Sequence, residues 1–169
     1  MTEFESEINI SGSLEGLSCT EKDISELIKL LIKVEPKLKQ KLISKSINLS
    51  FLSKSEIEKL NSKFLNKNKP TNVLSFPSSG FGFDDAFLGD IAICPEIIVN
   101  EAHEQGKDKQ NHLSHIIMHS LLHLAGYDHQ DRYSSELMES LEIIALKKLG
   151  IANPYWNTLR YVCVYEVRR

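Results

Sequence analysis

Apolar positions along this chain recur at two different spacings, and each spacing predicts a different kind of element. Alternation of apolar and polar residues in the stretches 5–10 and 47–53, and short apolar runs in 71–76 and 88–94, predict four strands. Alternation in 160–167 predicts one further short strand near the end of the chain.

A spacing of three to four predicts helices, and start and stop signals support them. Thr20 with Asp23, and Ser53 with Glu56, have the capping-box spacing that begins a helix. The predicted helices cover residues 20–35, the stretch after Ser53, 95–106, 112–126, and a last helix that starts at Asp131 or Ser134 and runs to Leu149. Strands and helices mix without strict βαβ alternation, which predicts a single α+β domain.

Composition narrows the class of protein. The chain has 169 residues, 41% of them hydrophobic and 25% charged, which is typical of a globular domain. The opening stretch is acidic without an apolar run, and no stretch approaches about 18 apolar residues, so we expect neither a secretory signal nor a membrane span. The three cysteines, Cys19, Cys94 and Cys163, are far apart, which suits a reducing compartment and a cytoplasmic protein.

The net charge of −3 conceals an asymmetry. Residues 20–70 hold twelve lysines and six acidic residues, and the rest of the chain holds eight basic and seventeen acidic residues. Five of the lysines recur every four residues, at Lys29, Lys33, Lys37, Lys41 and Lys45, with Pro36 interrupting the row. The row is either a solvated helical face or a phosphate-binding surface, and the sequence leaves both readings open.

The stretch "HSLLHLAGYDH", residues 119–129, holds three of the six histidines. On a helix, His119 and His123 lie one turn apart and can reach one cation, and a turn at Gly126 can bring His129 back towards them. Three neutral imidazoles suit zinc or a similar divalent ion, and three protein ligands leave a position for water. The water on such a zinc ion has a pKa of about 7, which makes it a hydrolytic nucleophile.

Residues near the three histidines in sequence are candidates to contact and orient the ligand rings. Asp128 and Asp131 are close enough in sequence to orient a histidine ring. His115 lies one turn further back, where we expect a structural role or a role behind the metal ligands. We expect His103 and His112 at the surface.

The residue after the first ligand bears on the reaction. A zinc peptidase of the H-E-x-x-H class has a glutamate there as general base, and this chain has Ser120. The lysine-rich part of the chain favours a phosphodiester substrate instead.

Several stretches resemble one family. "HSLLHLAGYDH" resembles the H-G-x-L-H-L-x-G-Y-D-H signature of the YbeY family of endoribonucleases and ribosomal RNA maturation factors. "LNSKFLNKNKPTNVLSFP" resembles its L-N-x-x-Y-R-x-K-D-x-P-T-D-V-L-S-F-P stretch, "LGDIAIC" its L-G-D-I-x-I-S strand, and "ELMESLEIIALKKLGIANPY" its closing helix. The order and spacing hold from about Ile47 to Tyr155, so we expect a family domain over 1–155 and a tail over 156–169, with a possible added strand.

The resemblance implies a mixed four-stranded sheet with surrounding helices and a metal-binding cleft. It also implies one zinc ion per chain on His119, His123 and His129, and a cytoplasmic endoribonuclease selective for single strands. Its expected role is maturation of the 3′ end of small-subunit (16S) ribosomal RNA and ribosome quality control. The expected partners are ribosomal RNA and the small ribosomal subunit, with no membrane and no small-molecule cofactor beyond the metal.

The chain departs from the family pattern at several positions. Leu65 stands where the family has an arginine, Asn68 and Asn72 where it has aspartates, and Ser120 where it has a glycine. Loss of the arginine removes a natural phosphate clamp. The candidate RNA contacts are Lys63, Lys67, Lys69 and Ser75, of which the lysines could partly replace the arginine. Two alternatives therefore stay open: a non-catalytic ribosome-assembly factor with a structural metal, and a metallohydrolase of another substrate class.

Overall fold

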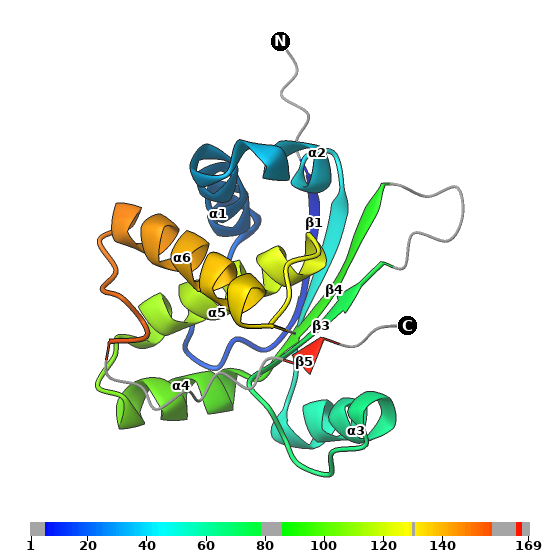
Figure 1. Cartoon of the computed structure of the whole chain (residues 1–169). Helices are drawn as coiled ribbons and strands as arrows, with labels where there is room; N and C mark the ends of the chain where they lie inside the picture. Colours follow the sequence, from blue (N-terminus) through cyan, green and yellow to red (C-terminus); the bar gives the residue numbers. More distant parts are fainter. Residues whose placement is uncertain (1–5, 79–85, 130, 157–164, 167–169) are drawn as a thin grey trace.

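The computed structural model describes residues 6–78, 86–129, 131–156 and 165–166. Figure 1 shows one sheet with helices packed around it. The strands are β1 (Glu7–Gly12), β2 (Ser46–Phe51), β3 (Val73–Pro77), β4 (Phe87–Ile93) and the two-residue β5 (Tyr165–Glu166). The helices are α1 (Glu21–Val34), α2 (Lys39–Leu42), α3 (Lys54–Leu65), α4 (Pro95–Glu104), α5 (Lys109–Leu124) and α6 (Arg132–Lys148), with a 3₁₀ turn at Pro36–Leu38.

The sheet is mixed, and its order is β1-β2-β4-β3-β5. Strand β1 pairs in parallel with β2, and β2 pairs in parallel with β4. Strand β3 runs antiparallel to β4. The short β5 pairs in parallel with β3, and it is the part of the predicted strand 160–167 that lies within the described residues. The α+β class is confirmed.

Local signals place the helix starts. Thr20 and Ser53 form the capping boxes predicted for α1 and α3, each accepting a hydrogen bond from the backbone three residues on. Asp131, the first of the two predicted candidates, caps α6 through the backbone N–H of Ser134. Helix α5 begins earlier than predicted, because Asp108 accepts hydrogen bonds from the backbone of Gln110 and Asn111.

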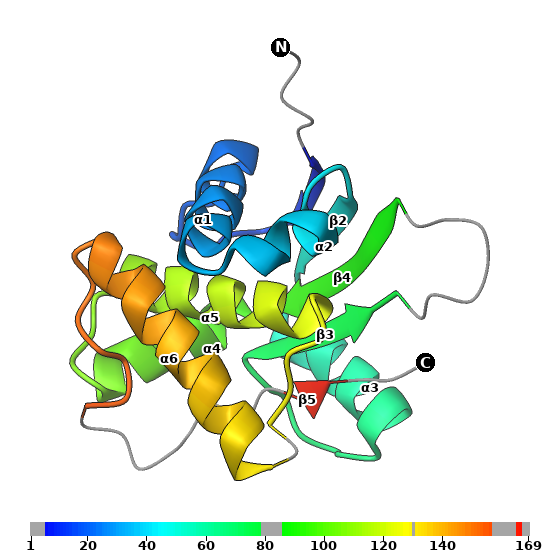
Figure 2. The same ribbon diagram turned by 45° about the horizontal axis from the view of Figure 1, so that its top comes forward.

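Two apolar clusters fill the space on the two faces of the sheet. The larger one joins the sheet to α1, α5 and α6, which lie together on one side (Figures 1 and 2). The smaller one lies under α3 and contains Ile57, Leu74, Phe76, Ala92 and Cys94. Side chains alternate between the two faces of a strand, so adjacent residues of β3 belong to different clusters. Val73 lies in the larger cluster and Leu74 in the smaller one.

Helix α5 is the central helix of the fold. It contacts β3, α4, α1 and α6, and every residue from Ile116 to Leu124 is buried. Polar side chains within this buried stretch need partners from within the protein, because bulk water does not reach them. Among the described residues, no helix combines the length and the apolar character that a membrane span requires.

Candidate metal centre

Three histidine rings converge at the end of α5. His119 and His123 come from consecutive turns of the helix, and their Nε2 atoms lie 3.0 Å apart. Gly126 has a φ of +93°, a conformation that a residue with a Cβ atom rarely adopts, and the chain turns there. The turn returns His129, whose Nε2 lies 3.4 Å from Nε2 of His119. The structure thus brings the three predicted ligands together.

The geometry and chemistry of these rings fit a divalent ion. One ring nitrogen from each of the three histidines lies within 4.8 Å of the others. Two nitrogens bound 2.0–2.1 Å from a tetrahedral ion are roughly 3.3 Å apart, close to the spacings of Nε2 in this cluster. Burial, followed by the charges of His119 and His129, lowers the pKa of His123 to about 3. The His123 ring is therefore neutral near pH 7 and keeps a lone pair for a metal.

A buried carboxylate lies behind the first ligand. Glu142 of α6 is 0% exposed, and its Oε1 lies 2.5 Å from Nδ1 of His119. Its other oxygen, Oε2, lies 2.9 Å from Nε2 of His115 and accepts a hydrogen bond from the Tyr155 hydroxyl. Burial raises the pKa of the Glu142 carboxyl, but the charge of His119 and hydrogen bonds from His115 and His119 outweigh burial and hold the pKa well below its usual range. Glu142 is therefore an ionised acceptor inside the protein.

Sequence reasoning missed Glu142, although the sequence contains a signal. Four residues of α6 spaced as one helical face, Met138, Leu141, Ala145 and Leu146, are buried apolar side chains. Glu142 lies on that same face, one turn after Met138. A charged residue on the buried face of an amphipathic helix requires a partner, which here comes from α5.

His115, His119 and Glu142 form a second group whose possible ligand atoms lie within 4.8 Å of one another. Their closest separations, 2.5 and 2.9 Å, are hydrogen-bond distances and shorter than the spacing of two ligands on a tetrahedral ion. We interpret this group as a hydrogen-bond network that supports the three-histidine cluster. His115 lies in this network, behind the cluster.

The flanking acids lie close to the cluster but contact the backbone. Asp128 Oδ1 accepts a hydrogen bond from the backbone N–H of His129, 2.6 Å away. Asp131 caps α6 and accepts a hydrogen bond from the Ser134 hydroxyl. The ring of His129 instead has Ser135 as a neighbour, with 3.1 Å between Nδ1 and Oγ.

The two histidines predicted at the surface differ in their exposure to solvent. His103 is exposed on α4. The prediction for His112 was wrong, because this residue is 3% exposed and its Nε2 lies 2.8 Å from Glu101 Oε2. The partner sits on the neighbouring helix α4, which the sequence pattern could not pair with α5.

The candidate RNA contacts do not form one surface. Lys63 and Lys69 are exposed and Lys67 is half-buried, around the end of α3. Ser75 is 0% exposed in β3, so its side chain does not belong to the surface that carries these lysines. Leu65 packs against the smaller apolar cluster.

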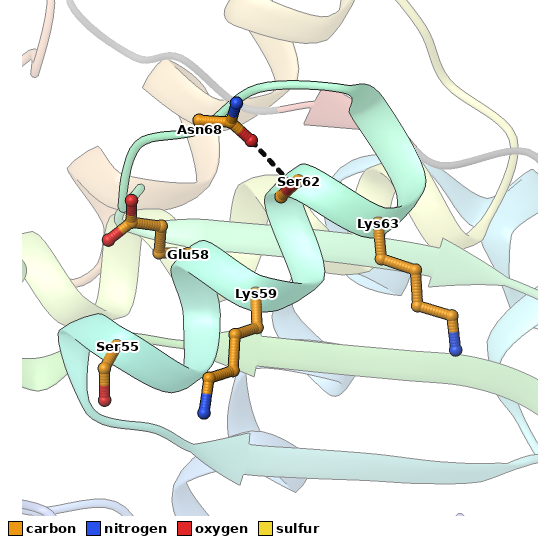
Figure 3. Close-up of a pocket in the computed structure, with 6 residues that line it drawn as sticks. All are labelled: Ser55, Glu58, Lys59, Ser62, Lys63 and Asn68. Carbon is orange, nitrogen blue, oxygen red and sulfur yellow. Dashed lines mark hydrogen bonds between the residues drawn. The ribbon is translucent and has the colours of Figure 1, made fainter.

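Helix α3 and the loop after it form an open hollow of about 460 Å³ (Figure 3). Its lining residues are Ser55, Glu58, Lys59, Ser62, Lys63 and Asn68. The Ser62 hydroxyl donates to Asn68 Oδ1 over 2.6 Å and so ties the loop to the helix. Two of the lining residues are lysines, and one of them, Lys63, is a predicted RNA contact.

The lysine row is divided between elements. Lys29 and Lys33 lie on α1, Lys37 in the 3₁₀ turn, Lys41 on α2 and Lys45 in the segment before β2. The row does not continue along one helix because α1 ends at Val34 and Pro36 begins the 3₁₀ turn. Lys29, Lys33, Lys37 and Lys41 are exposed, so the row is a surface feature without being one helical face.

Comparisons with known proteins agree with the geometry. Residues 9–150 match the model of the family described as "Endoribonuclease YbeY". A relative named "Endoribonuclease YbeY" from Francisella tularensis subsp. novicida is 52% identical over 114 residues, which are 64% of this chain and 70% of the relative. One from Francisella tularensis subsp. tularensis is also 52% identical, with 68% of its length covered. The solution structure of TM1509 from Thermotoga maritima is 26% identical, with a TM-score of 0.54 and coverage of 91% of this chain and 98% of that one.

Proposed function

We propose that this chain, which belongs to the endoribonuclease YbeY family, hydrolyses RNA phosphodiester bonds with a divalent metal ion held by His119, His123 and His129. The observation that carries the proposal is the convergence of the three rings: Nε2 of His119 lies 3.0 Å from Nε2 of His123 and 3.4 Å from Nε2 of His129. When bound, the ion would supply Lewis-acid activation of the phosphoryl group and of the attacking water.

The residues of the chain itself have separate tasks in this proposal. Neutral His123 offers a lone pair, and the buried Glu142 carboxylate orients the His119 ring from behind. Lys63 and Lys69 are exposed at the end of α3, where their charges can attract the phosphates of an RNA strand. Because lysine binds phosphate as a point charge, these contacts position the strand without selecting its bases.

We propose zinc as the metal and single-stranded RNA as the substrate, because three imidazoles suit zinc and the family resemblance implies single-strand selectivity. The proposed setting is the cytoplasm, with ribosomal RNA and the small ribosomal subunit as partners. The proposed roles are processing of the 3′ end of 16S ribosomal RNA and ribosome quality control.

RNA cleavage by the purified protein tests the activity. We expect cutting of single-stranded RNA, little cutting of a duplex of the same sequence, and loss of cutting after chelation. His123→Ala should abolish cleavage, and His103→Ala is the matched control because His103 is exposed on α4. Cleavage by His123→Ala at the wild-type rate would refute a role for the cluster in catalysis.

Processing in the cell requires a separate test. Cells depleted of the protein should accumulate small-subunit ribosomal RNA with an extended 3′ end. Wild-type protein should restore the mature end, whereas His123→Ala should not. Normal 3′ ends in depleted cells would contradict the ribosomal role and leave the nuclease activity itself intact.

Leu65 favours a second candidate function, that of a non-catalytic assembly factor. It stands where the family has arginine, and it packs against the apolar cluster under α3. A protein that binds single-stranded RNA with or without metal, and never cuts it, would support this alternative. A metallohydrolase of another class has less support, since Ser120 donates its hydroxyl to the Ile116 carbonyl inside α5.

A further inference from the structure

We propose that Glu142 is a positioning residue that fixes the tautomer of His119, with the proton on Nδ1 and the lone pair on Nε2. The inference rests on the proposed function, because the lone pair on Nε2 is the one that would bind the metal. Nothing in the sequence motif of three histidines requires this residue. It acts from α6, which lies beside α5 in both views (Figures 1 and 2).

Three hydrogen-bond partners surround the Glu142 carboxyl group. The two carboxyl oxygens of Glu142 face three groups that can each donate a proton, so the carboxyl group is the acceptor towards each of them. His119 presents Nδ1–H to Oε1 at 2.5 Å, and His115 presents Nε2–H to Oε2 at 2.9 Å. The Tyr155 hydroxyl also donates to Oε2. Glu142 is 0% exposed, so its carboxyl oxygens are closed to bulk solvent and their partners come from the protein.

The consequence for His119 follows from the tautomers of imidazole. A neutral ring carries one proton, so a proton on Nδ1 leaves Nε2 free. Nε2 is the atom that faces both His123 and His129. Glu142 therefore acts on the metal cluster by placing a proton on the far side of one ring.

The two oxygens of Glu142 have different numbers of hydrogen-bond partners, and this difference predicts how the amide of Glu142→Gln would be oriented. Two donors, His115 and Tyr155, meet at Oε2, and one donor, His119, meets Oε1. In Glu142→Gln, the amide oxygen is expected to take the place with two donors, and the NH₂ group is expected to face His119 Nδ1. An NH₂ group can only donate there, so the His119 proton must move to Nε2 and block the metal-binding atom.

The experiment compares the tautomer and the metal affinity. Two-bond ¹⁵N–¹H NMR spectra of the metal-free protein identify the tautomer of His119. The His119 signals are assigned as those that disappear in His119→Gln. Wild type is expected to show Nδ1–H, and Glu142→Gln is expected to show Nε2–H. Competition with a chelator for Zn²⁺ should give an affinity about 10–100-fold lower in Glu142→Gln than in wild type.

Two variants serve as controls. Glu136→Gln changes an exposed glutamate of the same helix, and its Zn²⁺ affinity should equal that of wild type. Tyr155→Phe removes one donor but leaves the carboxylate, so the Nδ1–H tautomer and the Zn²⁺ affinity should be retained within about threefold.

Three results would overturn the inference. One is an Nε2–H tautomer of His119 in wild type, and this measurement does not depend on the folding of any variant. The others are a Zn²⁺ affinity in folded Glu142→Gln equal to that of wild type, and an equal loss of affinity in Tyr155→Phe. If wild type showed the Nδ1–H tautomer but bound no Zn²⁺, the proposed function would fail and the role of Glu142 in fixing the tautomer would stand.

Discussion

The ammonium group of Lys41 donates a hydrogen bond to the carbonyl oxygen of Ala125, 2.8 Å away. Ala125 is the last residue before the turn at Gly126, so the contact joins the lysine-rich segment to the end of the histidine helix. A positive charge at the C-terminus of a helix is favourable, because the carbonyl groups there are unpaired and negatively polarised. Lys41 thus stabilises the turn that returns His129.

We predict that Lys41→Met lowers the free energy of unfolding by about 1 kcal/mol, because it removes a charged hydrogen bond to this helix end. Urea unfolding of the metal-free protein measures the change. Lys39→Met alters an exposed lysine of the same short helix and should change stability by less than about 0.5 kcal/mol. Equal effects of the two variants would show that the contact with Ala125 contributes nothing specific.

Metal binding should stabilise the folded protein. At a free Zn²⁺ concentration 100 times the dissociation constant, a single site that exists only in the folded state adds about 2.7 kcal/mol. For a chain of this size, the melting temperature should rise by about 5–10 °C. Thermal denaturation with and without a chelator measures the difference. The rise in melting temperature with Zn²⁺ should be absent in His129→Ala and retained in His103→Ala. A wild-type melting temperature that does not change with Zn²⁺ would show that the histidine cluster does not bind the ion.

The buried thiols should be unreactive at neutral pH. Burial, and then the charge of Asp23, raises the pKa of Cys19 to about 11, and burial also raises the pKa of Cys94. At pH 8, about one Cys19 thiol in a thousand is ionised, and the thiolate is the reactive form. In a Cys163→Ser background, alkylation by iodoacetamide should be slow at pH 8, accelerate as pH rises towards 11, and become fast after unfolding. Native thiols that reacted at pH 8 as fast as unfolded ones would show that neither is buried.

Restoring the family arginine at Leu65 should strengthen RNA binding. Leu65→Arg places a guanidinium at the end of α3, near the exposed Lys63 and Lys69. One added phosphate contact should steepen the salt dependence of binding to a single strand by about 0.7 in the logarithmic slope. The same variant should cost roughly 1 kcal/mol of stability, because Leu65 packs against the apolar cluster under α3.

Leu65→Met is the matched control for this substitution, since it retains an apolar side chain of similar size. It should leave both RNA binding and stability near the wild-type values. An unchanged salt dependence in Leu65→Arg would show that this position does not face the RNA in the bound state.

Local features of this protein were predictable from the sequence because their causes are local. The capping boxes at Thr20 and Ser53 depend on residues three positions apart. The convergence of His119, His123 and His129 depends on one helical turn and one glycine turn, and all three ligands lie within eleven residues of sequence. The α+β class followed from two spacings of apolar residues.

Features that depend on the packing of distant segments were not predictable in this way. Glu142 meets His115 across 27 residues of sequence and His119 across 23, through the packing of α6 on α5. His112 is buried where α4 packs on α5, and Glu101 of α4 is its hydrogen-bond partner. The position of β4 between β2 and β3 is likewise a result of tertiary pairing, which periodicity within a strand does not encode.

Titration of the metal-free protein with Zn²⁺, while cleavage of a single-stranded RNA is measured, tests whether the three-histidine cluster holds the catalytic metal. We expect no cleavage without metal and a plateau of activity at about one ion per chain, with elemental analysis giving the same stoichiometry. His123→Ala should show neither stoichiometric binding nor activity. Full cleavage by the metal-free protein, or one tightly bound ion retained by His123→Ala, would show that this cluster is not the catalytic metal site.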